Sequence, residues 1–308
     1  MKEFIRYMES KNHSASTQKS YLRCVKLFLK WVQKEDLQIT KPDILSYLEF
    51  LKERKGQQNA TRQNNLHALN HYFTHLYKSE RISDNPCLFL KVRGTKVKKL
   101  HNLYTGEELN ELYDNFYHVY IRNFKTCKYF GSGTVEYMQL TRARNYVAIG
   151  IMIYQGTIAG ELKNIRLEDI DLQKGTIKLH SNRRAKERVL PLNAAQVGAL
   201  INYIHNVKPK LEMIYKTAEY EDFLFSVENQ NFHDVTGYMQ KQLKAIDRKF
   251  KHFYQIRTSV ITNWLKAYGL RKTQYLAGHR SIGTTERYTS NDLQPLIDDI
   301  NNLHPFNL

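Results

Sequence analysis

The sequence has 308 residues, which favours two domains over one compact unit. Lys and Arg number 47 against 30 acidic residues, giving a net charge of +17, so the expected partners are polyanions: nucleic acid before an anionic membrane surface. A merely basic protein is the alternative. The sequence shows no apolar run long enough for a membrane span, and its first residues do not resemble a signal peptide. These two observations predict a cytoplasmic protein. Three widely separated cysteines predict neither disulfides nor a cysteine zinc site.

The first ninety residues carry apolar side chains at helical spacing. A helix is predicted over 16–33, capped by Ser16 or Thr17, and another over 40–54, where Thr40 and Asp43 form a capping-box pattern. A third is predicted over 61–79. These three helices predict an all-α N-terminal domain over residues 1–90.

The stretch "KVRGTKVKK", residues 91–99, has five basic residues, no acidic residue and no periodicity. It predicts an interdomain linker over 91–101, followed by a second domain over 102–308. Such a basic segment is either simply solvated or follows a DNA backbone.

The second half opens with a helix over 104–117, capped by Thr105 and Glu108. Residues 118–140 show no period and are interpreted as a surface insertion, before a buried helix over 141–155. The period then changes to two, which predicts short strands within 165–172, 175–181 and 187–192. Further helices are predicted over 193–206, 237–250 and 257–269, the last ended by Gly269. The fold class is therefore mainly α with a small β-sheet in the second domain.

Basic residues concentrate in the linker, in the hairpin at 183–188, and between 241 and 257. Arg and Lys side chains are the usual phosphate contacts, so these clusters predict a DNA-binding surface. The candidate DNA contacts are Lys91, Arg93, Lys96, Lys98, Lys99, Arg184, Arg188, Lys241 and Lys244.

The C-terminal stretch "YQIRTSVITNWLKAYGLRKTQYLAGHRSIGTTERYT" resembles the catalytic end of the tyrosine recombinases, the phage-integrase and Xer-type family. Arg257 stands at the Arg of the family's His-x-x-Arg, Gly278-His279 at its Gly-His pair, and Tyr288 nine residues after that His. "YQGTIAGELKNIRLEDID" and "RRAKERVLPL" are similar to two upstream family segments. The resemblance covers nearly the whole chain and implies a SAM-like core-binding domain followed by an α+β catalytic domain.

The resemblance implies site-specific DNA recombination without metal or other cofactor. Tyr288 would attack a DNA phosphate and form a 3′-phosphotyrosine, which conserves the bond energy for rejoining. Arg257 would clamp the phosphate and His279 would donate to a nonbridging oxygen, because the transition state carries spread negative charge. A cation on the hairpin, Arg183 or Lys186, would protonate the departing 5′ oxygen.

The sequence departs from the family pattern at three positions. Ile158 stands where the first catalytic arginine is expected, Tyr254 stands in place of the histidine before Arg257, and Arg183 stands at the lysine position, with Lys186 close by. Tyr254 still donates a hydrogen bond and the hairpin keeps a cation, whereas Ile158 cannot donate. Arg166 is left open as its replacement. The departures predict an active recombinase with a modified site, against which stands a DNA-binding relative that no longer cleaves.

The resemblance also implies assembly. Four protomers would bind double-stranded DNA, each closing its two domains as a clamp, and a docking tail at about 290–308 would reach a neighbouring protomer. An accessory DNA-bending protein and a host mobile element are left open, and a type IB topoisomerase-like relaxing enzyme is a further alternative. His67, His71 and His75 repeat every four residues, but they lack a carboxylate or Cys companion and predict a polar helix face, not a metal site.

Overall fold

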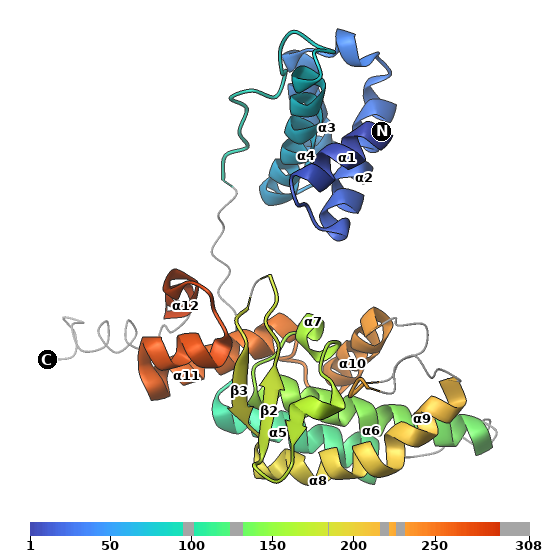
Figure 1. Ribbon diagram of the computed structural model, residues 1–308, viewed down its shortest axis with the longest axis vertical. Coiled ribbons are helices and arrows are strands. Elements are labelled where there is room, and N and C mark those ends of the chain that lie inside the picture. Colours follow the sequence, from blue (N-terminus) through green and yellow to red (C-terminus); the bar gives the residue numbers. More distant parts are fainter. Residues whose placement is uncertain (95–101, 124–131, 184, 216–221, 226–231, 290–308) are drawn as a thin grey trace, which may run out of the picture. The chain divides into compact units, whose positions relative to one another are not determined.

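The computed structural model describes residues 1–94, 102–123, 132–183, 185–215, 222–225 and 232–289 (Figure 1). The chain divides into two compact units, Met1–Lys99 and Leu100–Leu308, each with its own hydrophobic core. In the described ranges no helix is long and apolar enough to cross a membrane.

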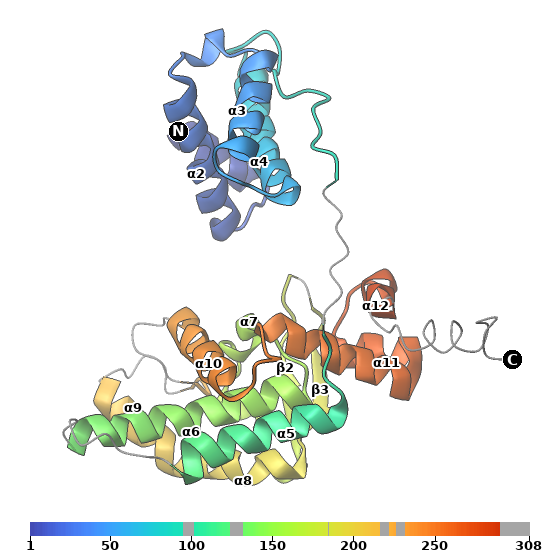
Figure 2. The same ribbon diagram turned by 180° about the vertical axis from the view of Figure 1, so that it is seen from behind.

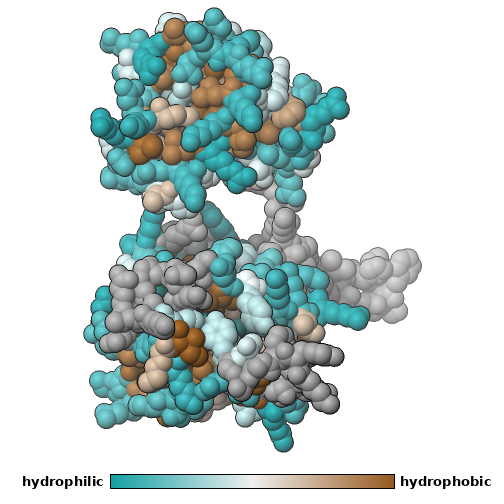
Figure 3. All heavy atoms as spheres, turned by 90° about the vertical axis from the view of Figure 1, so that its right-hand side faces the viewer, coloured by the Kyte–Doolittle hydropathy of each residue, from teal (hydrophilic) through white to brown (hydrophobic). Residues whose placement is uncertain are grey.

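The N-terminal unit is made of helices: α1 (Lys2–Ser10), α2 (Ala15–Val32), a short 3-10 turn η1 (Asp36–Gln38), α3 (Lys41–Glu53) and α4 (Asn59–Lys78). Apolar faces of these helices meet around Phe28, Leu69 and Phe73, none of which is exposed. In Figure 3, hydrophilic side chains surround the hydrophobic atoms visible on one face of this unit.

The helices predicted in this unit are confirmed, with shifted starts. Ser14 caps α2 by accepting a hydrogen bond from the Thr17 amide at 3.2 Å, so neither predicted cap, Ser16 or Thr17, is the observed one. Asp43 accepts a hydrogen bond from the Thr40 amide at 2.8 Å, as the capping-box pattern predicted. His71 packs edge-on against His13, and no group of three or more metal-ligating side chains occurs among the described residues.

The second unit opens with α5 (Gly106–Tyr117), a π-helical turn η2 (His118–Arg122), α6 (Ser132–Tyr154), α7 (Ala159–Leu162) and a 3-10 turn η3 (Leu167–Asp169). The predicted cap of α5 is confirmed, since the Glu108 amide donates to Thr105 Oγ1 at 3.1 Å. The insertion predicted over 118–140 is wrong in part, because residues 118–122 and 132–140 are helical. The buried apolar residues of α6 lie in its later turns, whereas residues 134–139 are exposed or half-buried and mix polar with apolar side chains, so its early turns show no clear apolar stripe.

Three antiparallel strands follow in the order β1 (Ile170–Asp171), β2 (Thr176–Leu179) and β3 (Arg188–Pro191). Leu179 pairs with Arg188 and Thr176 with Pro191, so the β2–β3 loop holds residues 180–187. The alternation of β3 turns Arg188 and Leu190 inward and Val189 outward. Figures 1 and 2 show the sheet lying against the helices of this unit.

After the sheet, the described part of the chain continues with helices: α8 (Ala194–Asn202), the π turn η4 (Tyr203–Val207), α9 (Lys208–Tyr215), α10 (Phe232–Ile246), α11 (Phe253–Ala277) and α12 (Ile282–Thr289). The predicted stop at Gly269 is confirmed as a break within α11, where φ is +72° and ψ is −178°. The mainly helical fold with one small sheet is thus the predicted class, and it places α11, α12 and the β2–β3 loop around one site.

Candidate active site

Arg257 lies on the first turns of α11 and is held by main-chain carbonyls on two sides. Its Nη1 donates to the Gly156 carbonyl, and its Nη2 donates to the Ala277 carbonyl at 2.9 Å. The same Nη2 lies 3.5 Å from His279 Nε2. The side chain is buried, so its position is fixed before any ligand arrives. A preorganised guanidinium of this kind suits a phosphate better than a mobile surface arginine.

The turn between α11 and α12 sets the position of His279. Gly278 ends α11 with φ +69° in the left-handed region, where its amide donates to the Tyr275 carbonyl at 2.9 Å. A Cβ built on Gly278 would lie 2.6 Å from Arg188 Nη1. Glycine is therefore required here for backbone geometry and for space. His279 follows directly and is brought back beside Arg257.

His279 is buried and electrically constrained. Its Nδ1 lies 2.9 Å from the hydroxyl of the buried Thr285 on α12. Burial, with the nearby positive charges of Arg257 and Arg188, lowers the pKa of His279 to about 4. The imidazole is therefore neutral at physiological pH and has one N–H to donate.

Tyr288 lies on α12 with its ring stacked on His279, the ring centroids being 5.5 Å apart. Only 8% of the residue is exposed. Burial, reinforced by a hydrogen bond with Tyr254, raises the pKa of Tyr288 to about 12, while the charge and hydrogen bond of Arg257 act in the opposite direction. The raised pKa favours the neutral phenol near neutral pH, in contact with the cation that would stabilise its phenolate.

Tyr254, one turn before Arg257, differs from the other three side chains because it is exposed by 54%. Its hydrogen bond with Tyr288 nevertheless places it at the rim of the site. The structure thus brings together four of the predicted catalytic residues: Arg257, His279, Tyr288 and Tyr254.

Arg183 and Lys186 lie on the β2–β3 loop, and both are exposed. This loop is attached to the site through its backbone. Ala185 forms a β-bridge with His279, and the Lys186 amide donates to the Gly278 carbonyl at 2.7 Å. Both cations are therefore carried by a segment that is bonded to the turn bearing His279.

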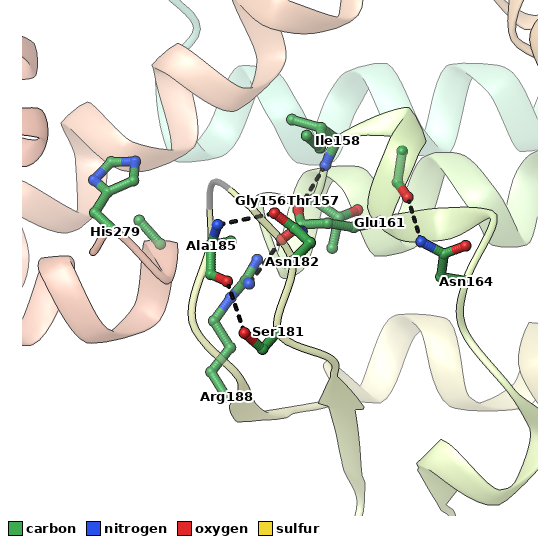
Figure 4. A network of polar contacts seen from close by, with 12 residues as sticks. Gly156, Thr157, Ile158, Glu161, Asn164, Ser181, Asn182, Ala185, Arg188 and His279 are labelled. Atoms are coloured by element: carbon green, nitrogen blue, oxygen red, sulfur yellow. Dashed lines mark hydrogen bonds and ion pairs between the residues drawn. The ribbon is translucent and has the colours of Figure 1, made fainter. Parts of the chain in front are cut away.

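Sequence reasoning missed an ion pair beneath these residues. Arg188 Nη1 donates to Glu161 Oε1 at 2.7 Å, and both side chains are buried. Figure 4 shows Arg188 reaching from the hairpin toward Glu161, on the segment that also carries Gly156 and Ile158. The prediction of Arg188 as a surface DNA contact does not agree with this burial, because β3 alternation turns it inward with Leu190. The period-two alternation of strand faces in "ERVLPL", which puts Arg188 on the same face as Leu190, was the sequence signal that could have indicated that Arg188 is buried.

Glu161 also faces Arg257, whose Nη1 lies 3.7 Å from Glu161 Oε2. The same oxygen accepts the Ile158 amide at 3.0 Å, at the start of α7. Ile158 thus contributes a backbone donor to Glu161 and no side-chain donor to the site.

Arg166, which the sequence left open as a replacement at the Ile158 position, and the buried Arg144 both have partners elsewhere. Arg166 lies over the ring of Phe223, 5.6 Å from its centroid, and 3.8 Å from Glu168. Arg144 is buried and donates to Asn145 and to the Tyr215 hydroxyl at 3.1 Å. Neither takes part in the contacts that surround Arg257.

The predicted DNA contacts are distributed unevenly over the described chain. Four of these side chains are exposed to solvent, as a DNA contact requires: Lys91, Arg93, Lys241 and Lys244. Lys96, Lys98, Lys99 and Arg184, and the predicted tail from residue 290, lie outside the described residues.

Comparison with known proteins identifies the class to which this fold and site belong. Residues 132–294 match the Phage integrase family, and residues 1–82 match the phage integrase N-terminal SAM-like domain. The chain therefore belongs to the phage integrase family. It is a site-specific tyrosine recombinase that acts on DNA.

Individual relatives are distant but collinear with the chain. It is 25% identical to the TnP I resolvase of Bacillus thuringiensis, over 95% of this chain and 96% of that protein. Its fold is similar to that of the XerH site-specific recombinase bound to palindromic difH substrate in a post-cleavage complex, with a TM-score of 0.66, 20% identity, and coverage of 96% and 82%. A lambda integrase tetramer bound to a Holliday junction gives a TM-score of 0.59 at 15% identity, over 90% of this chain and 75% of that one.

Proposed function

We propose that Tyr288 is the nucleophile and that the chain cleaves and rejoins one DNA strand at a time. The single observation that carries this is the contact of Tyr288 with both His279 and Arg257 in one buried cluster. The phenol oxygen attacks the scissile phosphorus and loses its proton, the bond from phosphorus to the 5′ oxygen breaks, and the 5′ oxygen is protonated. The product is a 3′-phosphotyrosine, whose ester bond is reversed in rejoining.

The roles of the surrounding groups follow from their charges. Arg257 stabilises the negative charge that spreads over the nonbridging oxygens, and it also favours the Tyr288 phenolate. Neutral His279 donates one hydrogen bond to the same oxygens. Arg183 or Lys186 on the hairpin delivers the proton to the leaving 5′ oxygen.

We infer that this site is a modified one. Ile158 offers no side-chain donor, and the buried cluster instead holds the Arg188–Glu161 pair beside Arg257. Loss of one preorganised donor costs roughly 3–4 kcal/mol of transition-state stabilisation. A compensating positive charge in the same cluster would reduce that loss.

We propose DNA binding by both domains and assembly of several protomers from the known behaviour of the family. The N-terminal domain (1–90) and the catalytic domain (102–308) close on double-stranded DNA, the basic linker (91–101) following its backbone. The similarity to a lambda integrase tetramer on a Holliday junction supports strand exchange by four protomers. We also propose that the chain acts on DNA in the cytoplasm and that an accessory DNA-bending protein assists it.

The test is covalent capture on a nicked suicide substrate that carries the cognate site, sought in the DNA flanking the gene. Wild-type protein should form a covalent adduct, and Tyr288→Phe should form none while shifting the same DNA in a gel. The control is Tyr275→Phe, a change at an exposed tyrosine of α11, which should leave the adduct intact. Binding without an adduct by the wild type would support the non-cleaving relative. Relaxation without recombinant joints would support the topoisomerase alternative.

A further inference from the structure

Arg188 is unusual because its guanidinium group is fully buried although only part of it has hydrogen-bond partners. Its side chain is 0% exposed, and Nη1 has Glu161 as its ion-pair partner. The Nε and Nη2 atoms are buried without a hydrogen-bond partner among the described residues. Burial of a cation whose N–H groups lack hydrogen-bond partners costs several kcal/mol in general. We therefore expect the positive charge of Arg188 to have a function at this position.

The charges of the cluster provide that reason. Arg257, Arg188 and Glu161 together carry a net charge of +1, and Glu161 lies within ion-pair distance of both arginines. Without Arg188 the cluster would be neutral, because the Glu161 carboxylate would offset Arg257. Attraction between opposite charges is strong in a buried site, so Arg257 would then have little charge to offer a phosphate.

Glu161 is not free to move away from Arg257. Its Oε2 accepts the Ile158 amide at 3.0 Å, which fixes the carboxylate at the start of α7. Its other oxygen, Oε1, accepts a hydrogen bond from Arg188 Nη1 at 2.7 Å. Its charge must therefore be offset where it stands.

The residues around Arg188 leave space for its guanidinium group. Gly278 leaves open the space that Arg188 Nη1 occupies, because a Cβ there would approach within 2.6 Å. The two residues of the turn, Gly278 and His279, thus lie beside Arg188 and Arg257 respectively. Arg188 is also one of the charges felt by His279.

We propose that Arg188 is a positioning residue that neutralises Glu161 and so leaves the charge of Arg257 available to the scissile phosphate. In this chain, which has Ile158 where another arginine is expected, the hairpin thereby supplies the second buried cation of the centre. This inference rests on the proposed strand-cleavage function.

The test compares three variants in single-turnover adduct formation on the suicide substrate, with protein in excess over DNA. Arg188→Met makes the cluster neutral, Glu161→Gln raises its charge to +2, and the double variant restores +1. The expected adduct rate falls about a hundredfold or more in Arg188→Met and returns to within about tenfold of wild type in the double variant. Glu161→Gln stays within about tenfold of wild type.

Two controls separate this from a purely structural ion pair. Thermal unfolding and gel shifts identify variants that are folded and bind DNA, and rates are compared only among these. A scissile methylphosphonate, which lacks the nonbridging charge, should be cleaved with a much smaller difference between wild type and Arg188→Met. A structural role would give the same difference on both substrates.

Three outcomes would overturn the inference: an unchanged rate in Arg188→Met, a double variant as slow as Arg188→Met, or an equal loss on the methylphosphonate. If Arg188→Met does not fold, Arg188→Lys keeps the charge and should cleave within about tenfold of wild type, and a folded but inactive Arg188→Lys would contradict the idea. Failure of the proposed function itself is distinct, because wild-type protein would then form no adduct.

Discussion

The imidazole of His279 stacks on the ring of Tyr288, with centroids 5.5 Å apart and planes inclined by 19°. This contact links the end of α11 to α12 and holds the proposed nucleophile against a neutral imidazole. The far side of that imidazole, at Nδ1, lies 2.9 Å from the Thr285 hydroxyl. Thr285, three residues before Tyr288 on the same helix, thus holds the ring on which the tyrosine rests.

Removal of the Thr285 hydroxyl should weaken this arrangement. Thr285→Val keeps the shape of the side chain but leaves His279 Nδ1 buried without its partner. We expect adduct formation to slow about tenfold, the value of one hydrogen bond of about 1.4 kcal/mol, while DNA binding is unchanged. Thr284→Val, at the neighbouring half-buried position, is the control. Equal rates in the two variants would show that Thr285 does not position His279.

Stability should fall in mild acid because of His279. Its pKa is about 4 in the folded chain against an ordinary value near 6.5, so the unfolded chain binds the proton first as the pH falls. The contribution is complete above about pH 6.5 and is lost as the pH falls toward 4. His279→Gln should therefore show a smaller decline in Tm across that range than wild type. Parallel declines, measured by thermal unfolding, would contradict the buried neutral imidazole.

The sequence alone led to Arg257, His279 and Tyr288 because their spacing along one segment is short and distinctive. It did not lead to the ion pair between Glu161 and Arg188, which are 27 residues apart and meet only through the fold. Arg188 was grouped with its basic neighbours, since net charge says nothing about the side of a strand on which a residue lies. The period-two pattern of β3 carries that information, and a buried arginine on the apolar face then requires a carboxylate partner.

The early turns of α6 were missed for a different reason. Residues 134–139 are exposed or half-buried and mix polar with aromatic and apolar side chains, so they show no apolar stripe and their sequence resembles irregular structure. The capping pairs at Thr40 and Thr105 were readable because the interaction that starts a helix lies within four residues.

A methyl group at Gly278 should disturb the site through Arg188. Gly278→Ala places a Cβ 2.6 Å from Arg188 Nη1 and also strains a φ of +69°. Gly175→Ala is a matched control, since Gly175 has φ +61° but nothing within 4 Å of its added Cβ. We expect both variants to lose about 1 kcal/mol of unfolding free energy, with a further loss of about 1–3 kcal/mol only in Gly278→Ala. Adduct formation should fall only in Gly278→Ala. Equal effects in both would mean that Arg188 moves aside freely.

Removal of the residues after Thr289 should affect assembly more than DNA binding. The segment 290–308 carries Leu293, Leu296, Ile297 and Ile300 at helical spacing, which suits docking on a neighbouring protomer. We expect the truncated chain to bind a single half-site with wild-type affinity and to lose cooperativity on the full site in gel-shift titrations. Unchanged cooperativity would indicate that the tail packs on its own domain.

The hairpin cation that protonates the leaving group can be identified with a modified substrate. Lysine is a better proton donor than arginine, whose pKa lies above about 12, and the Lys186 amide is bonded directly to the Gly278 carbonyl at 2.7 Å. We therefore expect Lys186→Met to slow cleavage about 10²–10⁴-fold and Arg183→Met to slow it less. A substrate with sulfur at the bridging 5′ position has a leaving group that needs no proton, so it should restore the rate of Lys186→Met. Restoration seen with Arg183→Met alone would transfer the general-acid role to Arg183, and restoration in neither would exclude both loop cations from proton transfer.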